Sequence, residues 1–173
     1  MSEYLKIPKR EKVVTLWVHP EGRVIGSLFL NLVSRSGGAE DPSEILNEPT
    51  PFVVLKRHGP EEIRFYNKAA IVRVEYAEDG DEALPDIPAV PCCLSLTDGS
   101  RIEGLLRQPM PPGYTRLYDY LNCNDGPFLK VYVGEGQVCL VNRAYIVCAT
   151  SREARWPQAA VQSQAYESSR VGP

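Results

Sequence analysis

The chain has 173 residues, of which 43% are hydrophobic and 24% charged, and its net charge is −3. These proportions are typical of a globular protein and exclude a disordered chain over most of the length. No apolar run approaches the roughly 18 residues that cross a bilayer, and residues 1–6 lack the apolar core of a secretion signal. We therefore expect a soluble cytoplasmic protein. Residues 79–150 carry 5 Lys+Arg against 9 Asp+Glu, which disfavours DNA as a partner because gripping a phosphate backbone requires clustered cations.

The sequence contains an internal repeat of one unit. Residues 16–26 align without gaps on residues 94–104, and later matches keep the same order: Leu46-Asn47 with Leu121-Asn122, Pro51-Phe52 with Pro127-Phe128, and residues 67–72 with 142–147. A duplication is therefore predicted, with an N-terminal arm (1–11), a first unit (12–76), an acidic, proline-containing linker (77–88), a second unit (89–150) and a mobile C-terminal tail (151–173).

Each unit shows the same predicted elements in chain order. Apolar residues alternate over 13–18, which predicts a strand with one face inward. A turn at residues 20–22, or 98–99, leads into a second strand, where Gly26 or Gly104 indicates bending or a close backbone approach. A helical turn begins at Asp41, which forms a capping-box pattern with Glu44, or at Thr115. Three more strands follow, over 52–56, 62–66 and 69–75 in the first unit and over 128–132, 137–141 and 144–150 in the second.

The alternation also predicts which side chains are buried. In the first unit these are Leu16, Val18, Val24, Leu28, Phe52, Ile63 and Phe65, and in the second they are Leu94, Leu96, Ile102, Leu106, Phe128, Val138 and Leu140. Trp17 points away from this core, and the fifth strands are apolar on both faces. We therefore expect Trp17, Ile71 and Ile146 to lie at an interface with the other unit or another chain.

The five strands, the bent second strand with its glycine, and the tight corner before the fifth strand resemble the Sm/LSm/Hfq superfamily. Residues 94–104 look like the first Sm motif, and residues 67–71 and 142–146 lie where the second motif is expected. The resemblance implies an all-β fold of two tandem five-stranded Sm-like barrels, each with a short helical turn between strands two and three. A generic SH3-like barrel is the rival. The family pairs the fourth strand of one barrel with the fifth of the next, so three chains would complete a six-barrel ring.

The resemblance also implies contact residues. Asn67, Lys68, Asn142 and Arg143 would contact a base edge and a phosphate at the corner, or else the asparagines cap the corner while the cations are solvated. Asp119 and Asn122, with Asn47 in the first unit, lie near the place where family members bind RNA. Alternatively, these three residues stabilise the helical turns themselves.

Catalysis has little support in the residues. Neither His19 nor His58 lies beside a recognisable nucleophile or carboxylate, and the chain has no glycine-rich phosphate loop and no paired-cysteine metal site. We therefore expect no enzyme activity, no cofactor and no metal, and we expect five free thiols. The predicted function is a protein-interaction or assembly module that self-associates. An RNA-binding, ring-forming protein is the alternative.

Overall fold

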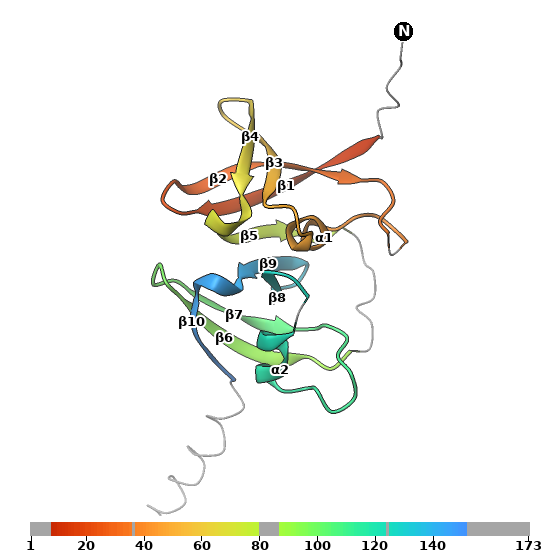
Figure 1. Ribbon diagram of the computed structural model, residues 1–173, viewed down its shortest axis with the longest axis vertical. Helices are drawn as coiled ribbons and strands as arrows, with labels where there is room; N and C mark the ends of the chain where they lie inside the picture. The colour runs from red at the N-terminus through yellow and green to blue at the C-terminus, as the bar shows by residue number, and fades with distance from the viewer. Residues whose placement is uncertain (1–7, 36, 80–86, 124, 152–173) are drawn as a thin grey trace, which may run out of the picture.

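The computed structural model describes residues 8–35, 37–79, 87–123 and 125–151. This part of the chain is all-β: ten antiparallel strands form one open sheet, with two short helices beside it (Figure 1). The first repeat contains β1 (Lys9–Val18), β2 (Gly22–Asn31), α1 (Pro42–Asn47), β3 (Phe52–Arg57), β4 (Glu62–Asn67) and β5 (Ile71–Ala77). The second repeat contains β6 (Val90–Leu96), β7 (Arg101–Leu106), α2 (Leu117–Asn122), β8 (Phe128–Gly134), β9 (Gln137–Asn142) and β10 (Ile146–Thr150). Neither helix has the length and hydrophobicity needed to cross a membrane.

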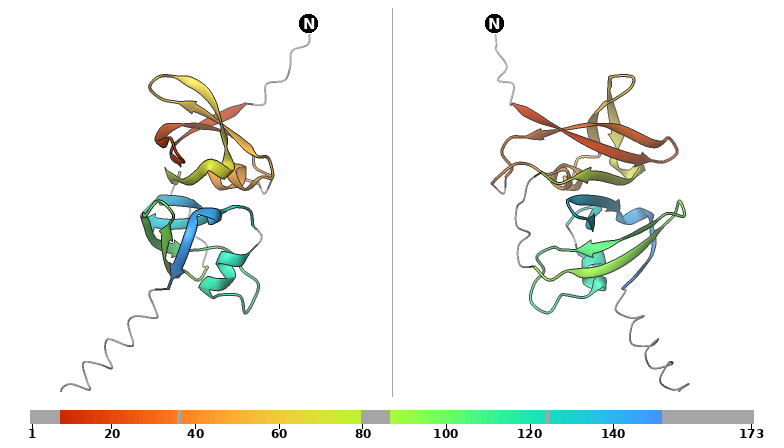
Figure 2. Two further views of the ribbon diagram at one scale, coloured as in Figure 1. Left: turned by 60° about the vertical axis from the view of Figure 1, so that its left-hand side comes forward. Right: turned by 180° about the vertical axis from the view of Figure 1, so that it is seen from behind.

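Both repeats have the same strand order. The sheet runs β10-β6-β7-β8-β9-β5-β1-β2-β3-β4, so each repeat is arranged as fifth, first, second, third and fourth strand. The two repeats meet where β5 pairs with β9, and Figure 2 shows them one above the other across this boundary. Within the described residues no pairing joins β4 to β5 or β9 to β10. The sheet is therefore open, and two closed five-stranded barrels are not confirmed.

Two glycines allow strands to approach each other closely. A Cβ atom on Gly26 in β2 would lie 2.6 Å from the carbonyl oxygen of Lys56. Gly104 occupies the matching place in β7, where a Cβ would collide with the carbonyl oxygen of Tyr132. Any larger residue would push the neighbouring strand away, so the close approach predicted at both glycines is confirmed.

The helices begin at capped positions. Asp41 accepts a hydrogen bond from the Ser43 amide (2.6 Å), and Glu44 accepts one from the Asp41 amide (3.2 Å), which confirms the predicted capping box of α1. In α2 the N-cap is Arg116 rather than the predicted Thr115. The Asp119 carboxylate there accepts a hydrogen bond from the Arg116 amide at 3.0 Å.

Short 3-10 turns, Lys68–Ala70 and Arg143–Tyr145, form the corners before the fifth strands. The side-chain oxygen of Asn67 accepts a hydrogen bond from the Ala69 amide at 2.9 Å, and that of Asn142 accepts one from the Ala144 amide at 3.0 Å. Each asparagine therefore caps its corner, which was one of the two interpretations of these residues.

The apolar core consists of two clusters, and each cluster takes residues from both repeats. Phe128, Val138 and Leu140 belong to the second repeat but pack into the cluster of the first. Val72 and the partly buried Trp17 belong to the first repeat but pack into the cluster of the second. The two repeats therefore share their cores and form one folded unit.

Three of the predicted core positions are wrong, all in the first repeat. Phe52, Ile63 and Phe65 are 53%, 52% and 69% exposed. Their counterparts in β8 and β9 are buried because the first repeat packs on them. Nothing in the described chain covers the corresponding face of β3 and β4. Ile102 is only half-buried, and the remaining predicted core residues are buried.

The structure also gives bounds for the predicted segments. β1 begins at Lys9, inside the predicted arm, and β5 extends to Ala77. β6 begins at Val90. Residues 80–86 of the predicted linker and residues 152–173 of the predicted tail lie outside the described residues.

Candidate functional site: a repeat junction and two free sheet edges

A fourth strand and a fifth strand pair within the chain itself. β5 lies antiparallel to β9, with five opposed pairs from Arg73↔Val141 to Ala77↔Gln137. Val74 and Leu140 face each other in this ladder, and both are fully buried. Such strand pairing was expected between chains, and here it forms a covered junction inside one chain.

Asn142 fixes the end of this junction. Its side-chain amide nitrogen donates to the carbonyl oxygen of Ile71 at 2.9 Å and to that of Lys68 at 3.3 Å. The residue is only 3% exposed. A buried amide must find such partners to offset its lost hydration. Asn142 thus joins the corner of the second repeat to the corner of the first.

Asn47, the last residue of α1, joins the same two repeats at a second point. Its amide nitrogen donates to the Phe128 carbonyl oxygen (3.2 Å), and its carbonyl oxygen accepts from the Phe128 amide (2.8 Å). The side chain therefore pairs with the start of β8 as a neighbouring strand would. The φ of Gly126 is +97°, and a Cβ there would collide with Asn47, so the loop before β8 also requires glycine.

A half-buried charge cluster supports this contact. Lys130 of β8 forms ion pairs with Asp41 (3.2 Å) and Glu78 (2.7 Å), and the Tyr76 hydroxyl donates to Asp41 at 2.8 Å. Burial acts to raise the pKa of Asp41, but the Lys130 charge and the hydrogen bonds from Ser43 and Tyr76 outweigh it and hold that pKa below its usual value. Burial is also the main reason why the pKa of Tyr76 is raised.

Trp17 lies at the boundary of the repeats. The Arg73 guanidinium stacks over its ring at 4.1 Å from the centroid, and the indole nitrogen donates to Glu75 at 3.1 Å. Arg73 also reaches the second repeat, donating to Ser100 at 3.0 Å and pairing with Asp98 at 3.4 Å. The interface that Trp17 contacts in this structure is therefore inside the chain.

The predicted corner cations point into the protein. Lys68 is buried and donates to the carbonyl oxygens of Ile45 (2.6 Å) and Glu48 (3.0 Å), and burial lowers its pKa. Arg143 donates to the carbonyl oxygens of Gly126 and Tyr120. Lys68 also donates to the Thr50 hydroxyl and Arg143 to the Cys123 sulfur, so in this structure both side chains bind neighbouring loops.

The remaining predicted contact residues separate into two groups. Asp119 caps α2, as described above, and Ile71 is fully buried at the junction. Asn67 and Asn122 are exposed, and Asn122 donates only within its own helix, to the Tyr118 carbonyl at 2.8 Å. Ile146 is half-buried in β10. Of the exposed residues, Asn67 ends β4, an outer strand of the sheet, and Asn122 ends α2.

Apolar side chains are exposed on β4 and β10, the two outer strands of the sheet, at positions where the counterpart side chains of β9 and β5 are buried. Leu140 of β9 is fully buried, whereas Phe65, at the same place in β4, is 69% exposed. Val72 of β5 is 5% exposed, whereas Val147, its counterpart in β10, is 66% exposed. Sequence reasoning placed Ile63 and Phe65 in the core, and their exposure follows only from knowing which strands meet. Figure 1 shows β4 and β10 far apart, one in each repeat.

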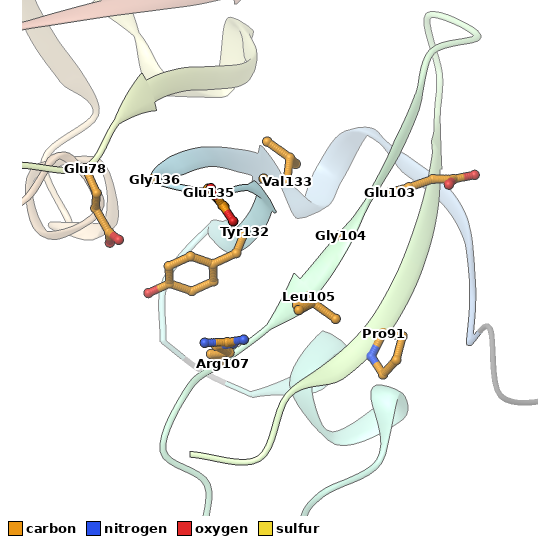
Figure 3. A pocket seen from close by; sticks show the side chains of 11 residues that line it. Glu78, Pro91, Glu103, Gly104, Leu105, Arg107, Tyr132, Val133, Glu135 and Gly136 are labelled. Atoms are coloured by element: carbon orange, nitrogen blue, oxygen red, sulfur yellow. The ribbon is translucent and has the colours of Figure 1, made fainter. Parts of the chain in front are cut away.

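A hollow of about 590 Å³ opens in the second repeat, where β7 and β8 pair only at Leu105↔Tyr132 (Figure 3). In the first repeat β2 and β3 pair at three positions, and His58 contacts Ser27 at 3.0 Å. The counterparts of these two residues in the second repeat are Gly134 and Leu105. The lining comprises Glu78, Pro91, Glu103, Gly104, Leu105, Arg107, Tyr132, Val133, Gly134, Glu135 and Gly136. This lining includes no histidine, serine or cysteine that could act as a nucleophile or its base.

The five cysteines are free thiols in the structure. Burial raises the pKa of Cys92 to about 11 and that of Cys139 to about 12, so these two thiols remain protonated at neutral pH. Cys148 is exposed on β10. Within the described ranges, no group of three or more His, Cys, Asp or Glu side chains could hold a metal ion.

Comparison of the chain with known family models, with curated proteins and with solved structures gave no match.

Proposed function

We propose that this chain is a non-catalytic assembly module that joins polypeptide chains, further copies of itself among them, through its two exposed sheet edges. One observation carries the proposal: Ile63 and Phe65 of β4 and Val147 of β10 are exposed, while their counterparts at the β5–β9 junction, Val138, Leu140 and Val72, are buried. The chain therefore contains one complete pairing of a fifth with a fourth strand, β5 with β9, and it leaves one fourth strand (β4) and one fifth strand (β10) at the outer edges of the sheet. We also propose that each repeat is a small Sm-like barrel left open, which its strand order supports.

The energetics favour covering these edges. An outer strand presents unpaired amide and carbonyl groups, and apolar side chains on it invite pairing with another strand. Phe52, Val54, Ile63 and Phe65 are all exposed on β3 and β4. Burying a side chain of this size contributes about 1.5–3 kcal/mol, so even part of this surface would stabilise an assembly.

RNA binding, the alternative function, has weaker support. The predicted contact cations Lys68 and Arg143 already donate to backbone carbonyls. The second repeat is acidic, which opposes attraction of a phosphate backbone. A salt-sensitive mobility shift with oligo-U or oligo-A RNA would support RNA binding over the proposed function.

The experiment that tests the proposal is the mass of the native particle by light scattering, from about 0.1 to 100 μM, a range that spans typical weak and tight associations. We expect the wild-type chain to exceed the mass of one 19.3 kDa chain. Phe65→Asp should lower the mass because it places a charge on the bare edge. Val33→Asp is the matched control, since Val33 is also apolar and 72% exposed but lies outside the strands. A single-chain mass for the wild type, or equal masses for both variants, would contradict the proposal.

A further inference from the structure

The hollow between β7 and β8 interrupts the sheet at a place where the first repeat continues it. Its volume of about 590 Å³ lies within the roughly 300–1,000 Å³ of small-molecule sites. The strands β2 and β3 of the first repeat pair at three positions, whereas β7 and β8 pair only at Leu105↔Tyr132. The second repeat therefore leaves room for a ligand beside this single pair.

Arg107, just after the end of β7, lines this hollow without a partner for its charge. Its Nε atom is buried and has no hydrogen-bond partner. The Nε atoms of Arg10 and Arg143 are also unpaired, but the terminal nitrogens of those side chains donate to other groups. Within the described residues, the Arg107 side chain forms neither an ion pair nor a hydrogen bond. A buried N–H group without a partner loses its hydration uncompensated, so a bound anionic group would stabilise it.

The fold of the repeat does not require a cation at this place. The match of residues 16–26 with 94–104 continues along the second strand and makes Phe29 the counterpart of Arg107. Phe29 lies in β2, which pairs with β1 as β7 pairs with β6. An aromatic side chain therefore occupies this place in one copy of the same strand arrangement, and the charge of Arg107 is left for a contact outside that arrangement.

Glu135 is the second unpaired charge of the hollow. Three carboxylates line it together with Arg107, and they belong to Glu78, Glu103 and Glu135. Glu78 and Glu103 each form an ion pair elsewhere, whereas Glu135 is exposed and forms no ion pair with a described residue. In the view of Figure 3, Glu135 and Arg107 lie on either side of the Tyr132 ring. One positive and one negative group are therefore available to a ligand.

We propose that this hollow binds a small zwitterion, an amino acid or a dipeptide with an apolar side chain. The planar guanidinium of Arg107 binds the carboxylate through paired hydrogen bonds, and the Glu135 carboxylate binds the ammonium group. The apolar side chain packs on Leu105 and Val133, which also line the hollow. A bare anion would be repelled by the carboxylates of the lining, and a bare cation by Arg107. The site adds ligand binding to the proposed function and uses neither of the two sheet edges.

Calorimetric titration of the full-length chain tests the chemistry of the ligand. The probes are L-leucine and leucyl-leucine, with N-acetyl-leucine and leucinamide as analogues that each lack one charge. We expect at least one of the first two to bind at concentrations up to about 10 mM, a range that covers weak ligands, and the tighter of them distinguishes an amino acid from a dipeptide. Both analogues should bind about tenfold more weakly or worse, because hydrogen bonds between charged groups are the stronger ones.

Arg107→Gln tests the carboxylate contact. It should weaken binding of the zwitterion about tenfold or more, while leaving the binding of leucinamide unchanged because that analogue lacks the carboxylate. Arg116→Gln is the matched control, since Arg116 belongs to the same repeat but is exposed and lies outside the lining. The control variant should bind the zwitterion as the wild type does.

Gly134→His tests the hollow by a route that leaves both charges in place. A Cβ on Gly134 would meet only the Cβ of Gln137, at 3.9 Å, so the chain should fold. The counterpart of Gly134 is His58, which contacts Ser27 between the matching strands of the first repeat. The introduced imidazole would project between β7 and β8 in the same way, so binding should fall at least as far as in Arg107→Gln.

Three results would overturn the inference. If neither leucine nor leucyl-leucine binds, the hollow is not a site for such a zwitterion. If N-acetyl-leucine binds as tightly as the zwitterions, the ammonium group is not recognised. Equal affinities of Arg107→Gln, Arg116→Gln and the wild type would show that the ligand binds elsewhere. The native mass, which tests the proposed function, does not depend on any of these results.

Discussion

Replacing Asn47 with alanine should lower the free energy of unfolding of the chain. The substitution removes the hydrogen bonds of 2.8 and 3.2 Å that join the side chain to the Phe128 amide and carbonyl. Each such bond contributes about 0.5–1.5 kcal/mol net, so the free energy of unfolding should fall by about 1–3 kcal/mol. Because the two cores are shared across the junction, the whole chain should still unfold in one transition.

Urea denaturation, followed by circular dichroism, measures this change. The midpoint should fall with an unchanged slope, which indicates lower stability without a change in the surface exposed on unfolding. Asn122→Ala is the matched control, since Asn122 also ends a six-residue helix but donates only to Tyr118 inside it. At a dilution where the chain is single, it should change stability by less than about 0.5 kcal/mol. Equal losses in both variants would show that the effect belongs to the helix end and not to the junction.

Three further substitutions test the core and the charge cluster. Leu16→Ala and Leu94→Ala remove fully buried side chains from the two clusters, so each should cost about 2–5 kcal/mol in the same urea transition. Two separate transitions would contradict the shared cores. Asp41→Asn keeps a good N-cap but removes the charge opposite Lys130, so it should cost about 1–3 kcal/mol at pH 7. The pKa of Asp41 is lowered in the folded chain, so this stabilisation is present above the unfolded pKa, near 3.9, and is lost as pH falls through the folded value. If the wild type remains more stable than the variant at a pH below the folded pKa of Asp41, the stabilisation does not come from the ionised Asp41 carboxylate.

Local patterns allowed most of the elements to be predicted. The capping box at Asp41 and Glu44 depends on neighbouring residues only, whereas the close approaches at Gly26 and Gly104 are to the next strand along the chain, and each is confirmed. The alternation over residues 13–18 likewise lies in a strand. Such features follow from the chain because their partners are a few residues away or in the next strand.

The wrong predictions concern whether another part of the protein packs against a given face of a strand. Alternation showed that Ile63 and Phe65 share one apolar face of a strand, but it carries no information on whether another repeat packs on that face. The same limit applies to Lys68, because the carbonyls that it binds belong to α1 and its C-cap residue, about twenty residues earlier in the chain. One signal was present: residues 138–141 of β9 form a continuous apolar run, which indicates a strand covered on both faces.

Comparison of the two repeats also shows why only one of the fourth strands, β9, contains a continuous apolar run, residues 138–141. Cys139 of β9 is buried at the junction, where an arginine would lose its hydration. Its counterpart in β4 is Arg64, which forms ion pairs with Glu21 and Glu62. A charge on an outer strand opposes indiscriminate pairing. Because successive side chains point to opposite faces, Arg64 provides this protection without interrupting the apolar face formed by Ile63 and Phe65. The free edge can therefore stay soluble in a single chain and still present an apolar face to a strand in the correct register.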